Sequence, residues 1–260
     1  MKSPSPKVIV EVDDGVWTVS INRPDVRNAV DNETAEALAA IFKAYEADEQ
    51  ARVGILTGAG GNFCAGADLK EIASGNRRRR WETSDDGPMG PTRLLLSKPM
   101  IAAVEGYAVA GGLELAIWCD LRVVGQGARF GVFSRRWGVP LIDGGTVRLP
   151  RLIGQSRALD MILTGRPVEA DEAETMGLAN RVVEQGCALA VAQEMAAAMA
   201  EFPPQSLSHD RLSTYTQWSL PVREAIDREF AARADPSEAE AGAARFVGGA
   251  GRHGSFTDGD

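Results

Sequence analysis

The sequence predicts an α/β fold followed by a helical C-terminal region. Up to about Val124, short apolar runs typical of buried strands alternate with segments of helical periodicity, which favours crossovers between parallel strands. After Gly165 the apolar spacing becomes predominantly helical. We therefore expect an α/β core over residues 1–195 and a helical region with a tail over residues 196–260.

The strands of the core are predicted from apolar runs bounded by turn residues. These runs fall at residues 8–12, 16–21, 53–57 and 100–104. The sequence Asp-Asp-Gly at 13–15 supplies a turn between the first two runs. The chain is therefore expected to begin its core with two paired strands and then to add buried ones.

The helices are predicted from apolar spacing and from residues that start or end a helix. Asp31 or Asn32 is placed to cap the first helix, which continues to about Ala47. Later helices are expected at residues 169–176, 188–201 and, in several pieces, 206–244. Between Ser74 and Pro91, charged and turn-forming residues predict a mobile loop or a short lid.

Composition argues against several classes of protein. The 260 residues carry a formal net charge of -8, which argues against nucleic-acid binding and requires any site for a polyanion to be locally basic. The three cysteines lack metal-ligand spacing and leave one unpaired, so we expect reduced thiols, a cytoplasmic location and no metal. The N-terminal residues form no apolar signal segment, and acidic residues interrupt the longest apolar stretch, so we expect no membrane association.

Two short stretches each turn from a predicted strand into a helical pattern through small residues. They are Asn-Phe-Cys-Ala-Gly-Ala-Asp-Leu at 62–69 and Gly-Tyr-Ala-Val-Ala-Gly-Gly-Leu-Glu-Leu at 106–115. Small side chains leave backbone N–H groups bare, and the start of a helix makes such groups good partners for negative charge. Two such turns facing each other could hold one oxygen between two N–H groups and stabilise an enolate or oxyanion at a thioester carbonyl.

Further motifs surround these two stretches in a characteristic order. They are Asn22-Arg23-Pro24 with Asn28-Ala29, Lys98-Pro99 before the predicted strand at 100–104, Cys119-Asp120, Gly144-Gly145-Thr146, Arg148-Leu149-Pro150-Arg151 with Ile153-Gly154, and Leu163-Thr164-Gly165-Arg166. With them, nearly the whole chain resembles the crotonase (enoyl-CoA hydratase/isomerase) superfamily. The resemblance implies a crotonase-like core of ββα units wound into a spiral and a C-terminal helical region that forms trimers, or hexamers as dimers of trimers. It also implies an acyl-CoA thioester as the substrate, with no other cofactor.

The resemblance assigns an oxyanion hole to the backbone N–H groups of Ala67 and Gly111. Each lies beside a glycine, where a bulky neighbour would block a thioester oxygen. The alternative is that each glycine serves only the packing of a tight strand-to-helix turn. Contacts to the substrate or to CoA are predicted for Ala65, Asp68, Leu69, Lys70, Ser134 and Trp137.

Glu114 is the candidate acid/base. It follows Gly111 by three residues, and the resemblance places one of the two hydratase glutamates there. A carboxylate at this point would lie close to the carbon beside the thioester and would act as a general acid or base. The alternative is a capping carboxylate that accepts hydrogen bonds from free N–H groups at the start of the helix.

The second hydratase glutamate is missing. In hydratases it follows a Phe-Gly pair by a few residues, and here the position after Phe130-Gly131 is occupied by Ser134. A hydroxyl is too weak an acid or base to replace a carboxylate near neutral pH, which counts against plain hydratase activity. Asp143 is the candidate substitute, because other members of the superfamily place a catalytic aspartate in this loop. The alternative for Asp143 is an N-cap of the helix that follows.

These observations predict an acyl-CoA enzyme of fatty acid metabolism, most simply a hydratase and therefore a lyase. The alternatives are an enoyl-CoA isomerase, a thioester hydrolase and a non-catalytic acyl-CoA-binding protein, the last because of Ser134. The run Arg77 to Arg80 is expected either to reach the phosphates of CoA or to remain a solvated charge run. Arg252 and His253 occur where tails of the superfamily approach CoA of a neighbouring subunit.

Overall fold

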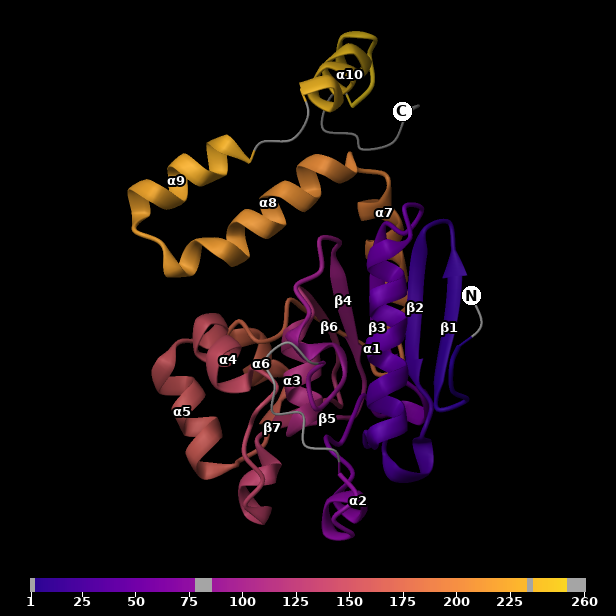
Figure 1. The fold of residues 1–260 in the computed structure, drawn as a ribbon, viewed down its shortest axis with the longest axis vertical. Helices are drawn as coiled ribbons and strands as arrows, with labels where there is room; N and C mark the ends of the chain where they lie inside the picture. The colour runs from indigo at the N-terminus through magenta and orange to yellow at the C-terminus, as the bar shows by residue number, and fades with distance from the viewer. Residues whose placement is uncertain (1–2, 78–85, 233–235, 252–260) are drawn as a thin grey trace. The chain divides into compact units, whose positions relative to one another are not determined.

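The computed structural model describes residues 3–77, 86–232 and 236–251. The chain divides into two compact units, residues 1–199 and 200–260, which are described separately (Figure 1). The first unit contains the mixed α/β structure and the second contains helices. The predicted α/β class and the helical C-terminal region are thereby confirmed.

The first unit is built on a six-stranded sheet with the order β1-β2-β3-β4-β6-β9. Its strands are β1 (Val8–Asp13), β2 (Val16–Ile21), β3 (Val53–Gly58), β4 (Met100–Val104), β6 (Leu121–Gly125) and β9 (Arg181–Val183). The first pair is antiparallel and every later pair is parallel, as the alternation of strands and helices predicts. Val53, Ile55 and Leu56 of β3 and all five residues of β4 are buried, which explains their apolar composition.

A second, smaller sheet has the order β5-β7-β8. Its strands are β5 (Tyr107–Val109), β7 (Arg129–Gly131) and β8 (Val168–Glu169). The first pair is parallel and the second is antiparallel. Strands of two or three residues are too short to show a period of apolar residues, so this sheet was not predicted.

Seven α-helices are described in the first unit (Figure 1). They are α1 (Asn32–Ala47), α2 (Leu69–Ala73), α3 (Gly111–Trp118), α4 (Gly145–Ile153), α5 (Gln155–Thr164), α6 (Ala170–Thr175) and α7 (Ala188–Ala200). Asp31 is the N-cap of α1, and its side chain accepts a hydrogen bond from the Thr34 amide. Two short 3₁₀ turns, η3 (Pro91–Arg93) and η4 (Phe133–Trp137), also carry residues of the site described below.

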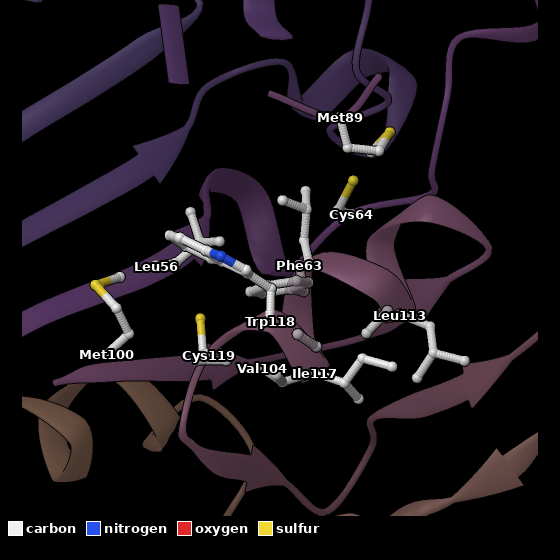
Figure 2. Packing of buried hydrophobic residues seen from close by; sticks show 14 of the residues in the cluster. Leu56, Phe63, Cys64, Met89, Met100, Val104, Leu113, Ile117, Trp118 and Cys119 are labelled. Carbon is white, nitrogen blue, oxygen red and sulfur yellow. The ribbon is translucent and has the colours of Figure 1, made fainter. Parts of the chain in front are cut away.

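Helix α3 lies in the centre of the hydrophobic core. Every residue from Gly112 to Trp118 is buried, and Glu114 is the one charged residue among them. Figure 2 shows Leu113, Ile117 and Trp118 of this helix among buried residues of the sheet. The Trp118 ring meets the Phe42 ring edge to face, with centroids 4.9 Å apart. This packing fixes the helix, and therefore the Glu114 carboxyl group, within a rigid core.

The second unit consists of α8 (Pro204–Thr216), α9 (Val222–Ala231) and α10 (Pro236–Val247), with a short 3₁₀ turn after α8. His209 of α8 bonds through Nε2 to the Glu229 carbonyl of α9, at 3.0 Å. The helices expose several large apolar side chains, which are Trp218, Val222, Ile226, Phe230, Phe246 and Val247. Across residues 3–77, 86–232 and 236–251, each helix is too short or too polar to cross a lipid bilayer.

Candidate active site

The two small-residue stretches, residues 62–69 and 106–115, lie side by side. The Cys64 amide donates to the Tyr107 carbonyl at 2.8 Å, and the Val109 amide donates to the Cys64 carbonyl at 3.1 Å. These bonds extend the parallel pairing between Cys64 and Ala108. Because the two stretches are hydrogen-bonded in register, the turns that follow them are forced into contact.

The two turns also approach each other closely at Gly66. Its φ of +96° is in the region that favours glycine, and a Cβ atom there would lie 3.0 Å from the Gly111 nitrogen and 3.0 Å from the Ala110 Cβ. Ala110 itself has a φ of +53°, which is unusual for a residue with a side chain. The local geometry therefore requires glycine at 66 because the second turn passes directly beside it.

The two residues assigned to an oxyanion hole line one cavity. Gly111 is the first residue of α3, where an N–H group has no partner within the helix. Among the described residues, neither the Ala67 amide nor the Gly111 amide donates a backbone hydrogen bond. Both residues line the same cavity, and in the described part of the chain neither amide is used in a backbone hydrogen bond there.

That cavity has a volume of about 200 Å³ and is largely apolar. Its polar lining comes from Glu114, Asp143, Ser134 and Arg77. The apolar lining residues include Ala65, Leu69, Ile72, Met89, Phe133, Trp137, Val139, Pro140 and Ile142. A volume this small suits an acyl group and its thioester better than a complete acyl-CoA, which would extend beyond the cavity.

Glu114 lies in the first turn of α3 and is 2% exposed. Its Oε1 accepts hydrogen bonds from the amides of Asp143 and Gly145, each at 2.8 Å. Burial, with the nearby Asp143 charge, raises the pKa of Glu114 to about 8. The carboxyl group therefore does cap free amides, but they belong to the start of α4 rather than to its own helix.

Asp143 is 4% exposed and borders the same cavity. Its Oδ1 accepts hydrogen bonds from the Met89 amide, at 2.9 Å, and from the Thr92 hydroxyl. Burial raises the pKa of Asp143 as well. The N-cap of α4 is Gly144, which has no side-chain cap, so Asp143 does not play the alternative helix-capping role. Its side chain instead joins the loop before α4 to the loop around residues 87–92.

Ser134 lies in η4 and is 7% exposed. Its Oγ is buried and has no hydrogen-bond partner in the part of the chain that the structure describes. A buried hydroxyl without a partner is uncommon in proteins and marks a place for a water molecule or a ligand. Trp137, at the other end of the same turn, is 67% exposed at the rim of the cavity.

The remaining predicted binding residues divide into two groups. Ala65 and Leu69 line the cavity. Asp68 is engaged elsewhere: its Oδ2 lies 3.0 Å from Nη2 of Arg23, and its Oδ1 accepts from the Lys70 amide at 3.0 Å. Lys70 is exposed and is not among the residues that border the cavity. Binding roles for Asp68 and Lys70 stay predictions from the sequence.

Arg77 is largely buried rather than solvated. Its Nη1 lies 3.0 Å from Oε2 of Glu71 and donates to the Val30 carbonyl at 2.8 Å, while its Nη2 donates to the Pro88 carbonyl at 2.6 Å. Arg77 therefore ties α2 to the loop that reaches the cavity. The other arginines of the run, Arg78 to Arg80, and the tail residues Arg252 and His253 lie outside the described residues.

Sequence reasoning missed Thr92 and Met89. Thr92 is 1% exposed and bonds Asp143 from a position 51 residues away, and no motif marks it. The Met89 side chain packs against Gly111, where a Cβ atom would lie 2.7 Å from the Met89 sulfur. The one sequence feature that bears on this contact is Gly111 at the start of α3, because a glycine leaves space for a large neighbouring side chain.

The described ranges 3–77, 86–232 and 236–251 contain no recognisable metal-binding site. They hold no group of three His, Cys, Asp or Glu side chains arranged to bind a metal ion. Cys64 is buried, and burial raises the pKa of its thiol to about 12. Its sulfur accepts from the Gly66 amide at 3.3 Å, so the thiol supports the turn that carries the first amide.

Comparison with known proteins gives a consistent result. The family model described as enoyl-CoA hydratase/isomerase matches residues 11–247. The enoyl-CoA hydratase EchA19 of Mycobacterium tuberculosis is 38% identical over 228 residues, which is 85% of each chain. A short-chain-enoyl-CoA hydratase of Clostridium acetobutylicum is 40% identical over 191 residues, 73% of each chain. The crystal structure of an enoyl-CoA hydratase from Mycobacterium tuberculosis H37Rv superposes with a TM-score of 0.87 at 33% identity, covering 94% of this chain and 96% of that one.

Proposed function

The chain belongs to the enoyl-CoA hydratase/isomerase family, and on that premise we propose that it adds water across the double bond of a 2-enoyl-CoA thioester. The observation that carries this proposal is one small cavity bordered by the Ala67 and Gly111 amides and by the Glu114 carboxyl group. An enoyl thioester needs both features, because charge develops on its carbonyl oxygen while protons move at its carbons. Relatives named as hydratases favour this reaction over the alternatives.

In the proposed reaction the two amides bind the thioester oxygen. The Asp143 carboxylate takes a proton from water as the water oxygen forms a bond to C3. The π electrons of the double bond move toward the thioester, giving an enolate whose negative oxygen is held by the N–H groups of Ala67 and Gly111. Protonated Glu114 then delivers its proton to C2. The products are the 3-hydroxyacyl thioester and the pair with its single proton moved from Glu114 to Asp143.

Proximity of the two carboxyl groups supports this division of labour. The Asp143 amide bonds Glu114, and the Asp143 charge contributes to the raised pKa of Glu114. Two buried carboxyl groups in one cavity hold a single proton between them over a range of pH, as acid/base pairs require. Asp143 would thus supply the second carboxyl group that hydratases place at the position of Ser134.

Ser134 has a different part in the proposal. Its unpartnered hydroxyl is a hydrogen-bonding group rather than an acid or base near neutral pH. In the proposal this hydroxyl, which borders the cavity, binds the attacking water or the C3 hydroxyl of the product. Leu69 and Trp137 would contact the acyl chain at the rim of the cavity, and Ala65 would contact CoA.

Isomerisation of a 3-enoyl thioester is the second candidate reaction. The specific observation in its favour is Ser134, because moving a double bond needs only one group that takes and returns a proton. Thioester hydrolysis and binding without catalysis are further alternatives. The assay therefore includes substrates for each.

The test is turnover with short and medium acyl chains. Loss of the conjugated enoyl absorbance with 2-enoyl-CoA is expected, with appearance of the 3-hydroxyacyl thioester by mass spectrometry. A rise of the same absorbance with 3-enoyl-CoA would identify an isomerase instead, and free CoA would identify a hydrolase. No change with any of these thioesters would overturn the proposed catalysis and leave acyl-CoA binding.

We also propose that the protein assembles as a trimer, or as a hexamer of two trimers. The exposed apolar side chains on α9 and α10 support this, since isolated helical surfaces of this kind pack against other surfaces in assemblies. Light scattering after size-exclusion chromatography would give the mass, and a monomer of 27.7 kDa would contradict the proposal. We further propose a cytoplasmic location and a role in fatty acid metabolism.

A further inference from the structure

We propose that Thr92 is a positioning residue for Asp143, and that it fixes which oxygen of that carboxyl group exchanges a proton with the substrate. The inference rests on the proposed function of Asp143 as an acid/base. It names Oδ2 as the reactive oxygen and Oδ1 as the anchored one. Thr92 itself acts through Asp143 and is assigned no contact with the substrate.

The anchoring contacts converge on Oδ1. The Thr92 hydroxyl, on the 3₁₀ turn η3, and the Met89 amide both donate to this oxygen, the amide at 2.9 Å. Thr92 is 1% exposed, so water does not compete for its hydroxyl. Space around the pair is tight: a Cβ atom at Gly87 would lie 2.0 Å from the Thr92 hydroxyl and 2.9 Å from Oδ1. Gly87 therefore packs closely against both side chains, and a side chain at position 87 would displace them.

The Arg148 side chain adds a further link between Asp143 and Thr92. Nη1 of Arg148 donates to the Asp143 carbonyl at 2.9 Å, and its Nη2 donates to the Thr92 carbonyl at 2.8 Å. The guanidinium group thus joins the backbones of the same two residues that are joined through their side chains. Thr92 and Asp143 are therefore linked both through their side chains and through their backbones.

Saturation of Oδ1 determines the fate of the proton. An oxygen that already accepts two hydrogen bonds gains little from binding a proton, so the proton resides on the other oxygen. Among the described residues no donor reaches Oδ2, and Asp143 borders the cavity. Glu114 repeats the pattern, because its Oε1 accepts two amide hydrogen bonds and its Oε2 accepts none from the same residues. Each carboxyl group therefore has one anchored oxygen and one that is available.

The charged groups around Asp143 bear on the measurement. They are Glu114 on α3, Arg77 before the loop, Arg93 on η3 and Arg148 on α4. All four remain when Thr92 is changed to valine, which keeps the volume of the side chain and removes only the hydroxyl. Loss of that hydrogen bond, which lowers the pKa of Asp143 against the opposing effect of burial, raises the pKa further.

The experiment compares Thr92→Val, Thr92→Ser, Asp143→Asn and the double variant Thr92→Val/Asp143→Asn. We expect Thr92→Val to lower kcat by about 10- to 100-fold with KM changed by less than about 2-fold, and to move the acid limb of the pH profile upward. Thr92→Ser should recover most of the rate because it restores the hydroxyl. The double variant should be no slower than Asp143→Asn alone, because Thr92 acts through Asp143.

Thr57→Val is the matched control for folding. Thr57 on β3 is 7% exposed and donates to the Ala103 carbonyl at 2.9 Å, but it does not border the cavity. It should reduce thermal stability without the change in pH profile. The inference alone is wrong if Asp143→Asn is slow while Thr92→Val keeps the wild-type kcat and pH profile. It is also wrong if Thr92→Val lowers kcat equally in the Asp143→Asn background. A wild-type kcat in Asp143→Asn would instead remove Asp143 from the proposed function, and the inference with it.

Discussion

The backbone amide of Asp143 donates a 2.8 Å hydrogen bond to Oε1 of Glu114. The residue that carries one buried carboxyl group therefore holds the other in place. A second amide, from Gly145, bonds the same oxygen and ties this arrangement to the start of α4. Movement of the loop before α4 would displace both carboxyl groups together, so their relative geometry is preserved by the backbone.

The first prediction concerns the pH dependence of kcat/KM. The active pair carries one proton, and the pKa of Glu114 near 8 marks its loss, so kcat/KM should fall as pH rises through about 8. Asp143→Asn removes a charge that raises this pKa, so any residual activity should show the alkaline limb at lower pH. The values of kcat/KM for hydration and for the reverse dehydration should show the same pH dependence. Their ratio is the equilibrium constant, which does not change with pH because the net reaction releases no proton. An alkaline limb unchanged in Asp143→Asn would contradict the coupling.

The second prediction tests the role of Glu114 itself. Glu114→Gln keeps an oxygen that can accept from the Asp143 and Gly145 amides but cannot exchange a proton. We expect turnover to fall by roughly two or more powers of ten while acyl-CoA still binds. Steady-state kinetics with calorimetric titration of a non-reactive acyl-CoA measures both. A variant that turns over at the wild-type rate would show that Glu114 is only a cap for α4.

The third prediction concerns the proposed oxyanion hole. In Gly66→Ala, the new Cβ atom would lie 3.0 Å from the Gly111 nitrogen, so this amide should be displaced and kcat lowered by roughly 100-fold. Gly61→Ala is a matched control, because Gly61 also has a positive φ, of +76°, but has nothing within 4 Å of its added Cβ. Both variants carry backbone strain, and only the first meets the second turn. Equal losses of activity in the two would show that strain, rather than the amide, matters.

Much of the arrangement around the cavity was predictable because it depends on local sequence. Apolar runs identified β3 and β4, and small residues after each identified the turns that meet at Gly66. The N-cap role of Asp31 likewise follows from the residue type at a helix start. In these cases the residues that determine a strand, a turn or a helix start lie within a few positions of it in the sequence.

The contacts that orient the carboxyl groups were not predictable in this way. The Thr92–Asp143 bond and the Asp143–Glu114 bond join residues 51 and 29 positions apart, respectively, with no repeating spacing to reveal them. From the sequence, the alternative role for Glu114 was to cap the start of its own helix. In the structure its carboxyl group instead accepts from amides at the start of α4. Such pairings arise from tertiary packing, which periodicity and turn chemistry do not encode.

The fourth prediction concerns stability and uses the sign of the Glu114 shift. The pKa is raised from 4.5 to about 8, so between these values the folded protein binds more protons than the unfolded chain. The free energy of unfolding should therefore decline with rising pH across this window, by at most about 1.4 kcal/mol per pH unit from this group. Glu114→Gln lacks the contribution and should gain stability relative to wild type toward pH 8. Urea unfolding at pH 5, 6.5 and 8 measures the difference, and a difference independent of pH would refute the assignment.

The last prediction separates two roles for Asp68. The sequence predicts a substrate contact, whereas in the structure its two oxygens meet Nη2 of Arg23 and the Lys70 amide, each at 3.0 Å. If those contacts are its main role, Asp68→Asn should lower the free energy of unfolding by about 1 kcal/mol and leave KM within about 2-fold of wild type. Lys70→Ala is the control for stability, because it keeps the amide that Asp68 accepts from and removes an exposed charge. A KM raised tenfold or more in Asp68→Asn, with unchanged stability, would instead establish Asp68 as a substrate-binding residue.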